Sequence, residues 1–223
     1  LRRQTERLEQ EVASRTAALS ERTADLERLA DEKTDLAVRL ERQSAAFERQ
    51  AREDSLTGLP NRRHFDEELG RAFLAAREAG TPIAVGLFDL DHFKRINDRF
   101  SHQIGDRVLE RIGAVLRGLS EEDVTAARYG GEEFALLFRG LPPDRVFARA
   151  EALREEIAGA GWETIASELS VTASIGLSAD SGVDHHERML VAADHELYRA
   201  KHEGRNRVSW NREERESSDS ATH

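Results

Sequence analysis

The sequence contains no cysteine among its 223 residues, which excludes disulfide bonds, thiol catalysis and metal sites with cysteine ligands. It also lacks an apolar stretch near the roughly 18 residues needed to cross a bilayer, and no signal-peptide pattern opens it. Its 33 basic residues are outnumbered by 43 acidic ones, and the net charge of -10 disfavours binding along nucleic-acid phosphates. These absences predict a soluble, cytoplasmic protein without nucleic-acid or membrane contacts in this segment.

Glycine and proline are absent from residues 1–50, where a seven-residue repeat predicts one continuous helix. Nine of the fourteen repeat positions are apolar and form the narrow stripe of a coiled coil, which Arg15, Arg22 and Lys33 interrupt. We expect a parallel homodimer through this coiled coil. The alternative is a single helix that is solvated or packs on a domain outside this sequence. The repeat positions are Leu1, Thr5, Leu8, Val12, Arg15, Leu19, Arg22, Leu26, Leu29, Lys33, Leu36, Leu40, Gln43 and Phe47.

Beyond Asp54, the turn-rich stretch 56–61 ends the helix, and helical and strand patterns then alternate. We expect helices at 62–78, 104–119, 144–158 and 187–202, and strands at 83–90, 169–177 and 207–210. Two further strands are expected within 124–138, joined at Gly130-Gly131. This order indicates an α+β domain with a largely antiparallel sheet at residues 51–210. The polar residues 211–223 are expected to be a disordered tail.

A first candidate site lies where the apolar strand 83–90 ends. Strand alternation predicts that Asp89 and Asp91 share one face, with Lys94 nearby. Carboxylates beside a lysine suit Mg²⁺ and a phosphate group, because Mg²⁺ prefers a few carboxylate oxygens and leaves positions for substrate oxygens. The alternative is a solvated strand end that caps the next helix.

A second candidate is the segment Arg128-Tyr-Gly-Gly-Glu-Glu-Phe134, where the two glycines predict a hairpin. Glu132 and Glu133 then begin the returning strand. Neighbouring strand residues point to opposite faces, so regular strand geometry would let only one of them share a metal with Asp89. The alternative is a polar hairpin tip without a ligand.

A third candidate is Lys201-His-Glu-Gly-Arg-Asn206, which places two cations at the end of a predicted helix. Such cations bind phosphates, but they also stabilise a helix C-terminus without any ligand. The eight histidines show no zinc-ligand spacing, and no nucleophile elbow, phosphate-binding loop or dinucleotide fingerprint is present.

Taken together, these segments resemble the GGDEF family of diguanylate cyclases over about residues 52–210. Six motifs stand in the family's order, which is far more specific than the Gly-Gly-Glu-Glu tetrad alone. The resemblance implies the palm-like βαββαβ core of nucleotide cyclases with extra elements, preceded by a long coiled-coil signalling helix. The six motifs are Asp54-Ser-Leu-Thr-Gly-Leu-Pro-Asn-Arg-Arg63, Phe88-Asp-Leu-Asp-His-Phe-Lys-Arg-Ile-Asn-Asp98, His102-Gln-Ile-Gly-Asp106, Arg128-Tyr-Gly-Gly-Glu-Glu-Phe134, Ser174-Ile-Gly176 and residues 193–206.

The resemblance implies an enzyme of the nucleotidyltransferase type that condenses two GTP into cyclic di-GMP and releases two pyrophosphates. Each 3′-hydroxyl attacks the α-phosphorus of the other GTP. Phosphoryl transfer requires positioning and charge neutralisation more than covalent catalysis. Two metal ions per site, Mg²⁺ or else Mn²⁺, would lower the pKa of the attacking hydroxyl and hold the triphosphate.

By motif position, the resemblance implies that Asp89 and Glu132 are metal ligands, assisted by the carbonyl of Leu90. Glu133 takes the family's second acidic position as a further ligand or as the general base, and the motifs leave the choice of base open.

Nucleotide contacts are also implied by motif position. Asn97 and Asp106 resemble the pair that reads the guanine edge, and a carboxylate accepts from guanine N1–H and N2–H₂, which adenine lacks. Lys94, Lys201 and Arg205 resemble the phosphate contacts.

One GTP per domain cannot close the product ring, so two sites must face each other across a homodimer. We therefore expect the coiled coil to hold the two domains together, with its register controlling whether they meet. The chain begins with Leu rather than Met, and we expect a fragment whose upstream sensor domain is missing.

The sequence departs from the family at two sites. The family's product-inhibition site, an Arg-x-x-Asp before the glycine pair, is replaced by Glu121 and Val124, so we expect no product-inhibition site here. Ser101 stands where the family usually has glycine. The alternatives are a non-catalytic GTP-binding regulatory module and a cyclase that makes a mixed or adenine dinucleotide.

Overall fold

The computed structural model describes residues 2–119, 123–179, 182 and 184–210 of the chain. Its contacts divide the chain into two units, Leu1–Ala51 and Arg52–His223. The tail predicted to be disordered, residues 211–223, lies outside the described residues, and so does Glu121.

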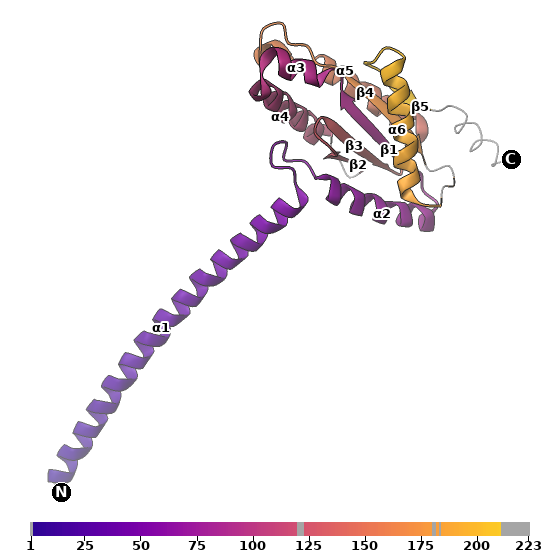
Figure 1. Ribbon diagram of the computed structural model, residues 1–223. Helices are drawn as coiled ribbons and strands as arrows, with labels where there is room; N and C mark the ends of the chain where they lie inside the picture. Colours follow the sequence, from indigo (N-terminus) through magenta and orange to yellow (C-terminus); the bar gives the residue numbers. More distant parts are fainter. Residues whose placement is uncertain (1, 120–122, 180–181, 183, 211–223) are drawn as a thin grey trace. The chain divides into compact units, whose positions relative to one another are not determined.

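The first unit consists of one uninterrupted helix, α1, Arg2–Arg52 (Figure 1). Among its described side chains, the apolar repeat positions between Val12 and Phe47 are exposed, with Leu26 at 66% and Phe47 at 68%. The single chain therefore leaves this apolar stripe open to solvent.

The second unit is a five-stranded sheet with helices on both faces. The strand order is β2-β3-β1-β4-β5, and all neighbours are antiparallel except the pair β4 and β5. The predicted α+β class and its βαββαβ core are confirmed. The elements are α2 Arg62–Ala79, β1 Ile83–Leu90, α3 Phe93–Phe100, α4 His102–Leu119, β2 Val124–Arg128, β3 Glu133–Arg139, α5 Pro143–Ala158, a 3₁₀ turn Trp162–Thr164, β4 Ala173–Ala179, α6 His186–His202 and β5 Val208–Trp210.

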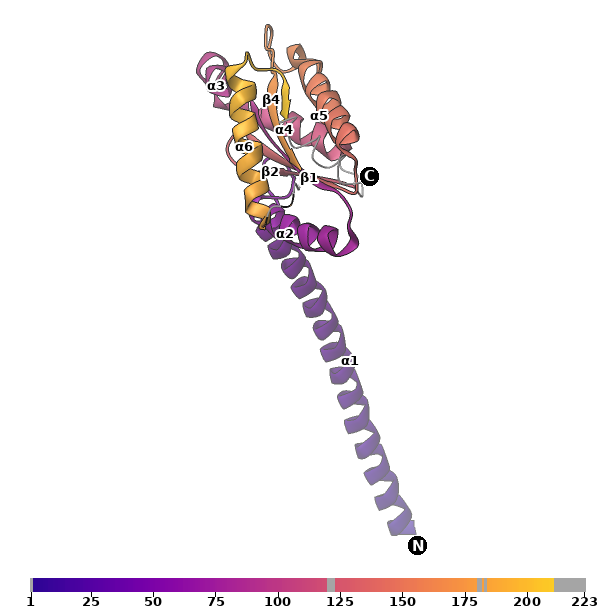
Figure 2. The ribbon, with the colours of Figure 1, turned by 90° about the vertical axis from the view of Figure 1, so that its right-hand side faces the viewer.

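The central strand β1 is buried along its whole length because both of its faces are covered. On one face, Phe88 packs with the side chains of α4 and α5, such as Ile112 and Leu153. On the other face, Val85 packs with α2 and α6. Figure 2 shows the sheet between α6 on one side and α5 on the other. Gly176 allows the closest of these contacts, because a Cβ there would lie 2.1 Å from the backbone nitrogen of Leu197 in α6.

Among the α-helices and β-strands, three elements differ from the sequence prediction by more than one residue. Helix α3 was not predicted, although Phe93 and Ile96 bury its apolar side. Helix α4 begins at His102 rather than at residue 104. Strand β4 begins at Ala173 rather than at 169, because the buried residues Leu169 and Val171 alternate like a strand but lie in an irregular segment.

Val124, one of the two positions in place of the family's product-inhibition pair, begins β2 and is 1% exposed. In the described part of the chain, no helix is both long and apolar enough to cross a membrane.

Candidate active site

Two neighbouring strands bring acidic side chains to one end of the sheet. The antiparallel register of β1 and β3 places Asp89 directly opposite Glu133. Side chains of directly opposed residues lie on the same face, with Cβ atoms about 4.5–5.5 Å apart, and like charges there repel. Asp89 is nevertheless 8% exposed, so a partly desolvated carboxylate sits beside a second acid.

Lys201, near the end of α6, supplies the compensating charge. Its Nζ lies 2.9 Å from Oδ2 of Asp89. Burial raises the pKa of Asp89 above its usual value, Lys201 opposes this rise, and the charges of Glu133 and Asp91 add to it. The site thus carries more negative charge than its one lysine neutralises.

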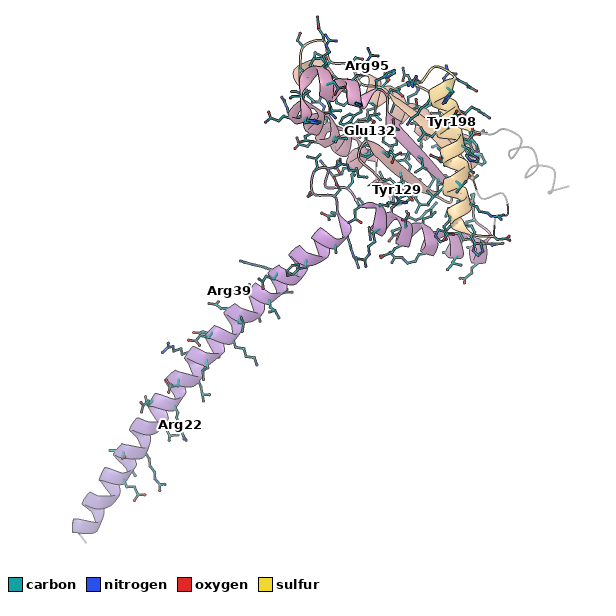
Figure 3. The ribbon with its side chains drawn as sticks, viewed as in Figure 1. Arg22, Arg39, Arg95, Tyr129, Glu132 and Tyr198 are labelled. Atoms are coloured by element: carbon teal, nitrogen blue, oxygen red, sulfur yellow. The ribbon has the colours of Figure 1, made fainter. Side chains whose placement is uncertain are left out.

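Glu132 lies in the bend before β3, so it does not follow strand alternation (Figure 3). Its backbone carbonyl accepts from the amide of Leu90 at 3.3 Å, which ties the hairpin to the end of β1. Burial, and then the charge of Asp89, raise the pKa of Glu132; Lys201 opposes the rise and Glu133 adds to it. Both glutamates therefore lie within electrostatic reach of each other, and Glu132 within reach of Asp89.

This donor set suits a hard divalent cation. Carboxylate oxygens are the ligands that Mg²⁺ prefers, and a cation would relieve the repulsion that raises the pKa values of Asp89 and Glu132. The described residues contain no preassembled group of three or more metal-binding side chains, and Lys201 instead stands at Asp89. The chemistry of the residues therefore fits a divalent metal. In this structure, Lys201 is the positive group that balances the charge of Asp89.

Asn97 and Asp106 lie on adjacent helices, α3 and α4. Asn97 packs against the residue before Asp106, since a Cβ on Gly105 would lie 2.0 Å from Oδ1 of Asn97. That oxygen is buried and has no hydrogen-bond partner among the described residues, whereas Asp106 is exposed. The turn between the helices is Ser101, whose φ of 112° and ψ of 160° fall in a region that only glycine adopts readily.

Lys94 and Arg205 are also exposed. Lys94 lies in the first turn of α3, and Arg205 follows α6 with a φ of 65°. Within the described residues, no hydrogen bond or ion pair joins Lys94 or Arg205 to Asp89 or Glu132. The structure therefore brings together Asp89, Glu132, Glu133 and Lys201. It leaves Lys94, Asn97 and Asp106 on α3 and α4, and Arg205 in the turn after α6.

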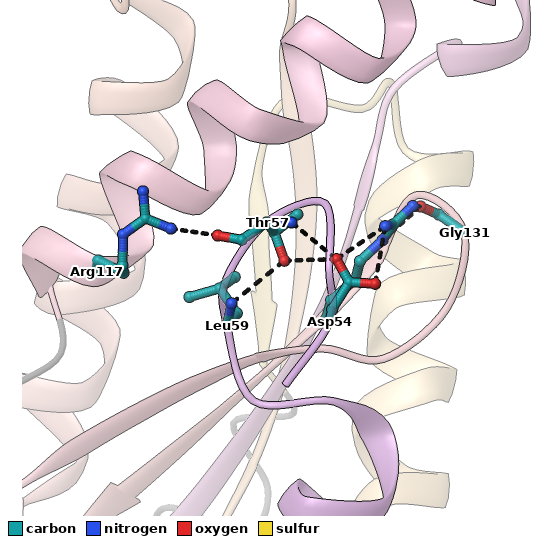
Figure 4. A network of polar contacts seen from close by, with 6 residues as sticks. Asp54, Thr57, Leu59, Arg117 and Gly131 are labelled. Atoms are coloured by element: carbon teal, nitrogen blue, oxygen red, sulfur yellow. Dashed lines mark hydrogen bonds and ion pairs between the residues drawn. The ribbon is translucent and has the colours of Figure 1, made fainter. Parts of the chain in front are cut away.

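Two residues beside this site have roles that the sequence did not predict. Strand alternation predicts Asp91 as a metal ligand beside Asp89, but its carboxylate accepts hydrogen bonds from Thr172, Ser174 and Asn206. Arg128 begins the glycine motif, and its sequence position predicts no contact with residue 54. It donates to both oxygens of Asp54 and also to the carbonyl of Gly131 (Figure 4).

Asp54 is the centre of the network in Figure 4. It also accepts from the amide and hydroxyl of Thr57, at 2.9 and 2.8 Å, and Arg117 of α4 donates to the carbonyl of Thr57. The turn after α1 is thus bonded both to α4 and to the glycine hairpin. Arg117 and Arg128 lie 60 and 74 residues from Thr57 and Asp54, so no local spacing could have predicted these two contacts.

Comparison with known families and proteins gives one consistent result. Residues 51–207 match the family described as "Diguanylate cyclase, GGDEF domain". The chain is 38% identical over 200 residues to diguanylate cyclase DgcP of Pseudomonas aeruginosa, covering 90% of this chain and 29% of that protein. It is 39% identical over 175 residues to diguanylate cyclase VdcA of Vibrio cholerae, covering 76% and 50%. The chain thus spans half or less of the length of these two relatives.

Solved structures resemble both parts of the chain. The coiled coil and GGDEF domain of DgcB from Caulobacter crescentus, in complex with c-di-GMP, is 34% identical with a TM-score of 0.74, covering 82% of this chain and 97% of that one. Diguanylate cyclase SiaD in complex with its activator SiaC, from Pseudomonas aeruginosa, is 28% identical with a TM-score of 0.68, covering 94% and 82%.

Proposed function

Because the chain belongs to the GGDEF family of diguanylate cyclase domains, we propose that it condenses two GTP into cyclic di-GMP and releases two pyrophosphates. The observation that supports this most directly is the gathering of Asp89, Glu132 and Lys201 at the end of β1. Excess negative charge beside a lysine is what a metal–triphosphate substrate requires.

Asp89 and Glu132 would hold the metal, with the carbonyl of Leu90, and Glu133 would be a further ligand or the base. When bound, the two Mg²⁺ ions that we propose, or Mn²⁺ in their place, would lower the pKa of the attacking hydroxyl and neutralise the triphosphate. Lys201 would turn to a phosphate oxygen once Asp89 has another positive partner. Lys94 and Arg205 would supply the remaining phosphate contacts.

Guanine would be read between α3 and α4. The exposed carboxylate of Asp106 can accept from guanine N1–H and N2–H₂, and Asn97 beside it carries a side-chain amide. An adenine ring presents no such pair of donors, so this arrangement favours GTP over ATP.

We also propose that residues 1–50 form a coiled coil, that residues 51–210 form the catalytic domain, and that the coiled coil joins two chains. The exposed leucines of α1 support a homodimer, because pairing would bury them. Since each domain offers one GTP site, the partner chain would supply the second GTP. Val124 is buried and is not an acid, so product inhibition through that position is not expected.

The direct test is chromatographic analysis of products after the protein is incubated with GTP and Mg²⁺. We expect cyclic di-GMP from the parent and from Glu110→Ala, an exposed residue of α4, but none from Glu132→Ala. Failure of the parent to form product while it still binds GTP would contradict the proposed activity and favour a regulatory GTP-binding module.

A further inference from the structure

The carboxylate of Asp91 accepts three hydrogen bonds from two separate segments, residues 172–174 and the turn after α6. Asp91 follows β1 and is 6% exposed. Its Oδ1 accepts from the hydroxyl of Ser174 at 2.7 Å, and its Oδ2 accepts from the hydroxyl of Thr172 at 2.7 Å and from the amide of Asn206 at 3.0 Å. An ionised carboxylate only accepts, so these three donors match it. The carboxylate of Asp91 is therefore occupied by hydrogen bonds within the protein.

The amide that reaches Asp91 belongs to an unusual turn. Gly204, Arg205 and Asn206 all have positive φ, at 121°, 65° and 45°, and the last two are not glycine. Side chains disfavour this region, so such a turn persists only where neighbouring groups hold it. Asp91 holds its backbone, and Nη1 of Arg154 in α5 donates to Oδ1 of Asn206 at 3.0 Å.

The same turn carries Arg205, three residues after the end of α6, while Lys201 in the last turn of α6 contacts Asp89. The end of β1 thus holds this segment twice, through the side chain of Lys201 at Asp89 and through the backbone of Asn206 at Asp91. We propose that Asp91 is a positioning residue that fixes the left-handed turn and so directs Arg205 to the triphosphate. This inference rests on the proposed function, in which Arg205 binds phosphate.

The substitution Asp91→Asn tests this, because an amide group cannot accept from all three donors. Binding is measured on the full chain with Mg²⁺ and 3′-deoxy-GTP, which lacks the attacking hydroxyl. We expect Asp91→Asn to weaken binding about tenfold in the parent but less than about twofold in an Arg205→Ala background, because residues that act as a unit are not additive. Thr172→Val, which leaves the Asn206 bond in place, should stay within about twofold of the parent.

Amide hydrogen exchange gives a readout that needs no nucleotide. The amide of Asn206 should be protected in the parent and exchange faster in Asp91→Asn. If Asp91→Asn does not fold, Arg154→Ala removes the other anchor of the turn and should show the same dependence on Arg205. An equal loss of binding in both backgrounds would show a purely structural role and overturn the inference, as would unchanged binding or unchanged exchange. A parent that binds no 3′-deoxy-GTP would instead overturn the proposed function, and the inference with it.

Discussion

The guanidinium of Arg128 joins Asp54, just after α1, to the carbonyl of Gly131 in the glycine hairpin. Its Nη1 lies 2.9 and 3.0 Å from the two oxygens of Asp54, and its Nη2 lies 2.7 Å from the Gly131 carbonyl. Both side chains of the ion pair are largely buried, at 15% and 22% exposure. One side chain therefore connects the beginning of the second unit to the segment that carries Glu132.

This pair predicts a pH-dependent stability. Partial burial alone would raise the pKa of Asp54, but the amide of Thr57 and the guanidinium of Arg128 hold the pKa below its usual value. A lowered folded-state pKa contributes stability above the unfolded pKa of about 3.9, and this contribution is lost as pH falls through the folded pKa. We expect Asp54→Asn to lower the free energy of unfolding by about 1.5–3 kcal/mol at pH 7, the range for hydrogen bonds to charged groups.

Urea unfolding of the parent and of Asp54→Asn at a series of pH values measures this difference. The gap between the two proteins should shrink as pH falls below about 4. Asp98→Asn, an exposed carboxylate of α3, is the matched control and should follow the parent. A gap that stays constant down to pH 3 would show that the charge of Asp54 contributes nothing.

The carboxylate of Glu132 should cost stability when no metal is bound. Its raised pKa means that the folded state opposes its ionisation, so its contribution to stability falls as pH rises through that pKa. Glu132→Gln should therefore be as stable as the parent at pH 7 or more stable, by no more than about 1 kcal/mol because solvent screens a partly exposed group.

Mg²⁺ should make the parent more stable than Glu132→Gln. A ligand at a hundred times its Kd stabilises a protein by about 2.7 kcal/mol, so the Tm of the parent should rise with Mg²⁺ while that of Glu132→Gln rises much less. Differential scanning fluorimetry with and without Mg²⁺ measures both effects, and Glu110→Gln should behave as the parent does. Equal Mg²⁺ shifts in all three proteins would remove Glu132 from the metal site.

Local patterns predicted the layers of the second unit but not the contacts that tie the site together. The apolar run at 83–90 and the glycine pair specified β1 and the hairpin, because both signals are local. Helix α3 was not predicted although Phe93 and Ile96 have helical spacing, because its eight residues are shorter than the window of about 11–18 residues in which helical periodicity stands out. The partners of Asp91 lie 81 to 115 residues away, and that distance is closed only by the packing of β4 and α6.

Asp106 should determine the choice of base. In Asp106→Asn, an amide group replaces an acceptor that would face two guanine donors, so we expect GTP binding to weaken about 10- to 100-fold, as for a lost hydrogen bond to a charged group. The ratio of GTP affinity to ATP affinity should also be smaller in Asp106→Asn than in the parent. Binding of both nucleotides is measured calorimetrically, with Glu110→Gln, one helical turn further along α4, as the control. Retained selectivity would place guanine recognition elsewhere.

The exposed seam of α1 should control assembly. Leu36→Lys with Leu40→Lys places charges on the seam, and we expect the protein to become a monomer. At the same protein concentration it should form about tenfold less product, because two GTP-binding domains then rarely meet. The control, Thr34→Lys with Val38→Lys, adds the same charge to exposed positions off the seam. Analytical ultracentrifugation and product formation are measured together.

The chain has no cysteine, so single cysteines introduced at different seam positions give defined cross-links. Each disulfide would fix one register of the coiled coil, and turnover should differ between them. Identical turnover in every cross-linked register would argue against control by the coiled coil, even if the dimer itself is confirmed.

Ser101 carries backbone strain between the helices of Asn97 and Asp106. Its φ of 112° and ψ of 160° lie where a side chain costs about 1–3 kcal/mol. Glycine would relieve that strain but adds about 0.5–1 kcal/mol of entropy cost on folding. We therefore expect Ser101→Gly to raise stability by about 1 kcal/mol, or about 2–4 °C in Tm for a domain of this size, without loss of product formation.

Ser170→Gly is the matched control, because Ser170 is exposed and its φ is not positive. Only the entropy cost applies there, so the control should lose about 0.5–1 kcal/mol while Ser101→Gly gains. Opposite signs for the same chemical change would identify the backbone conformation as the cause, since neither serine donates a side-chain hydrogen bond in the described residues. Equal losses at both positions would show that the turn at Ser101 is relaxed, and that serine there costs the fold nothing.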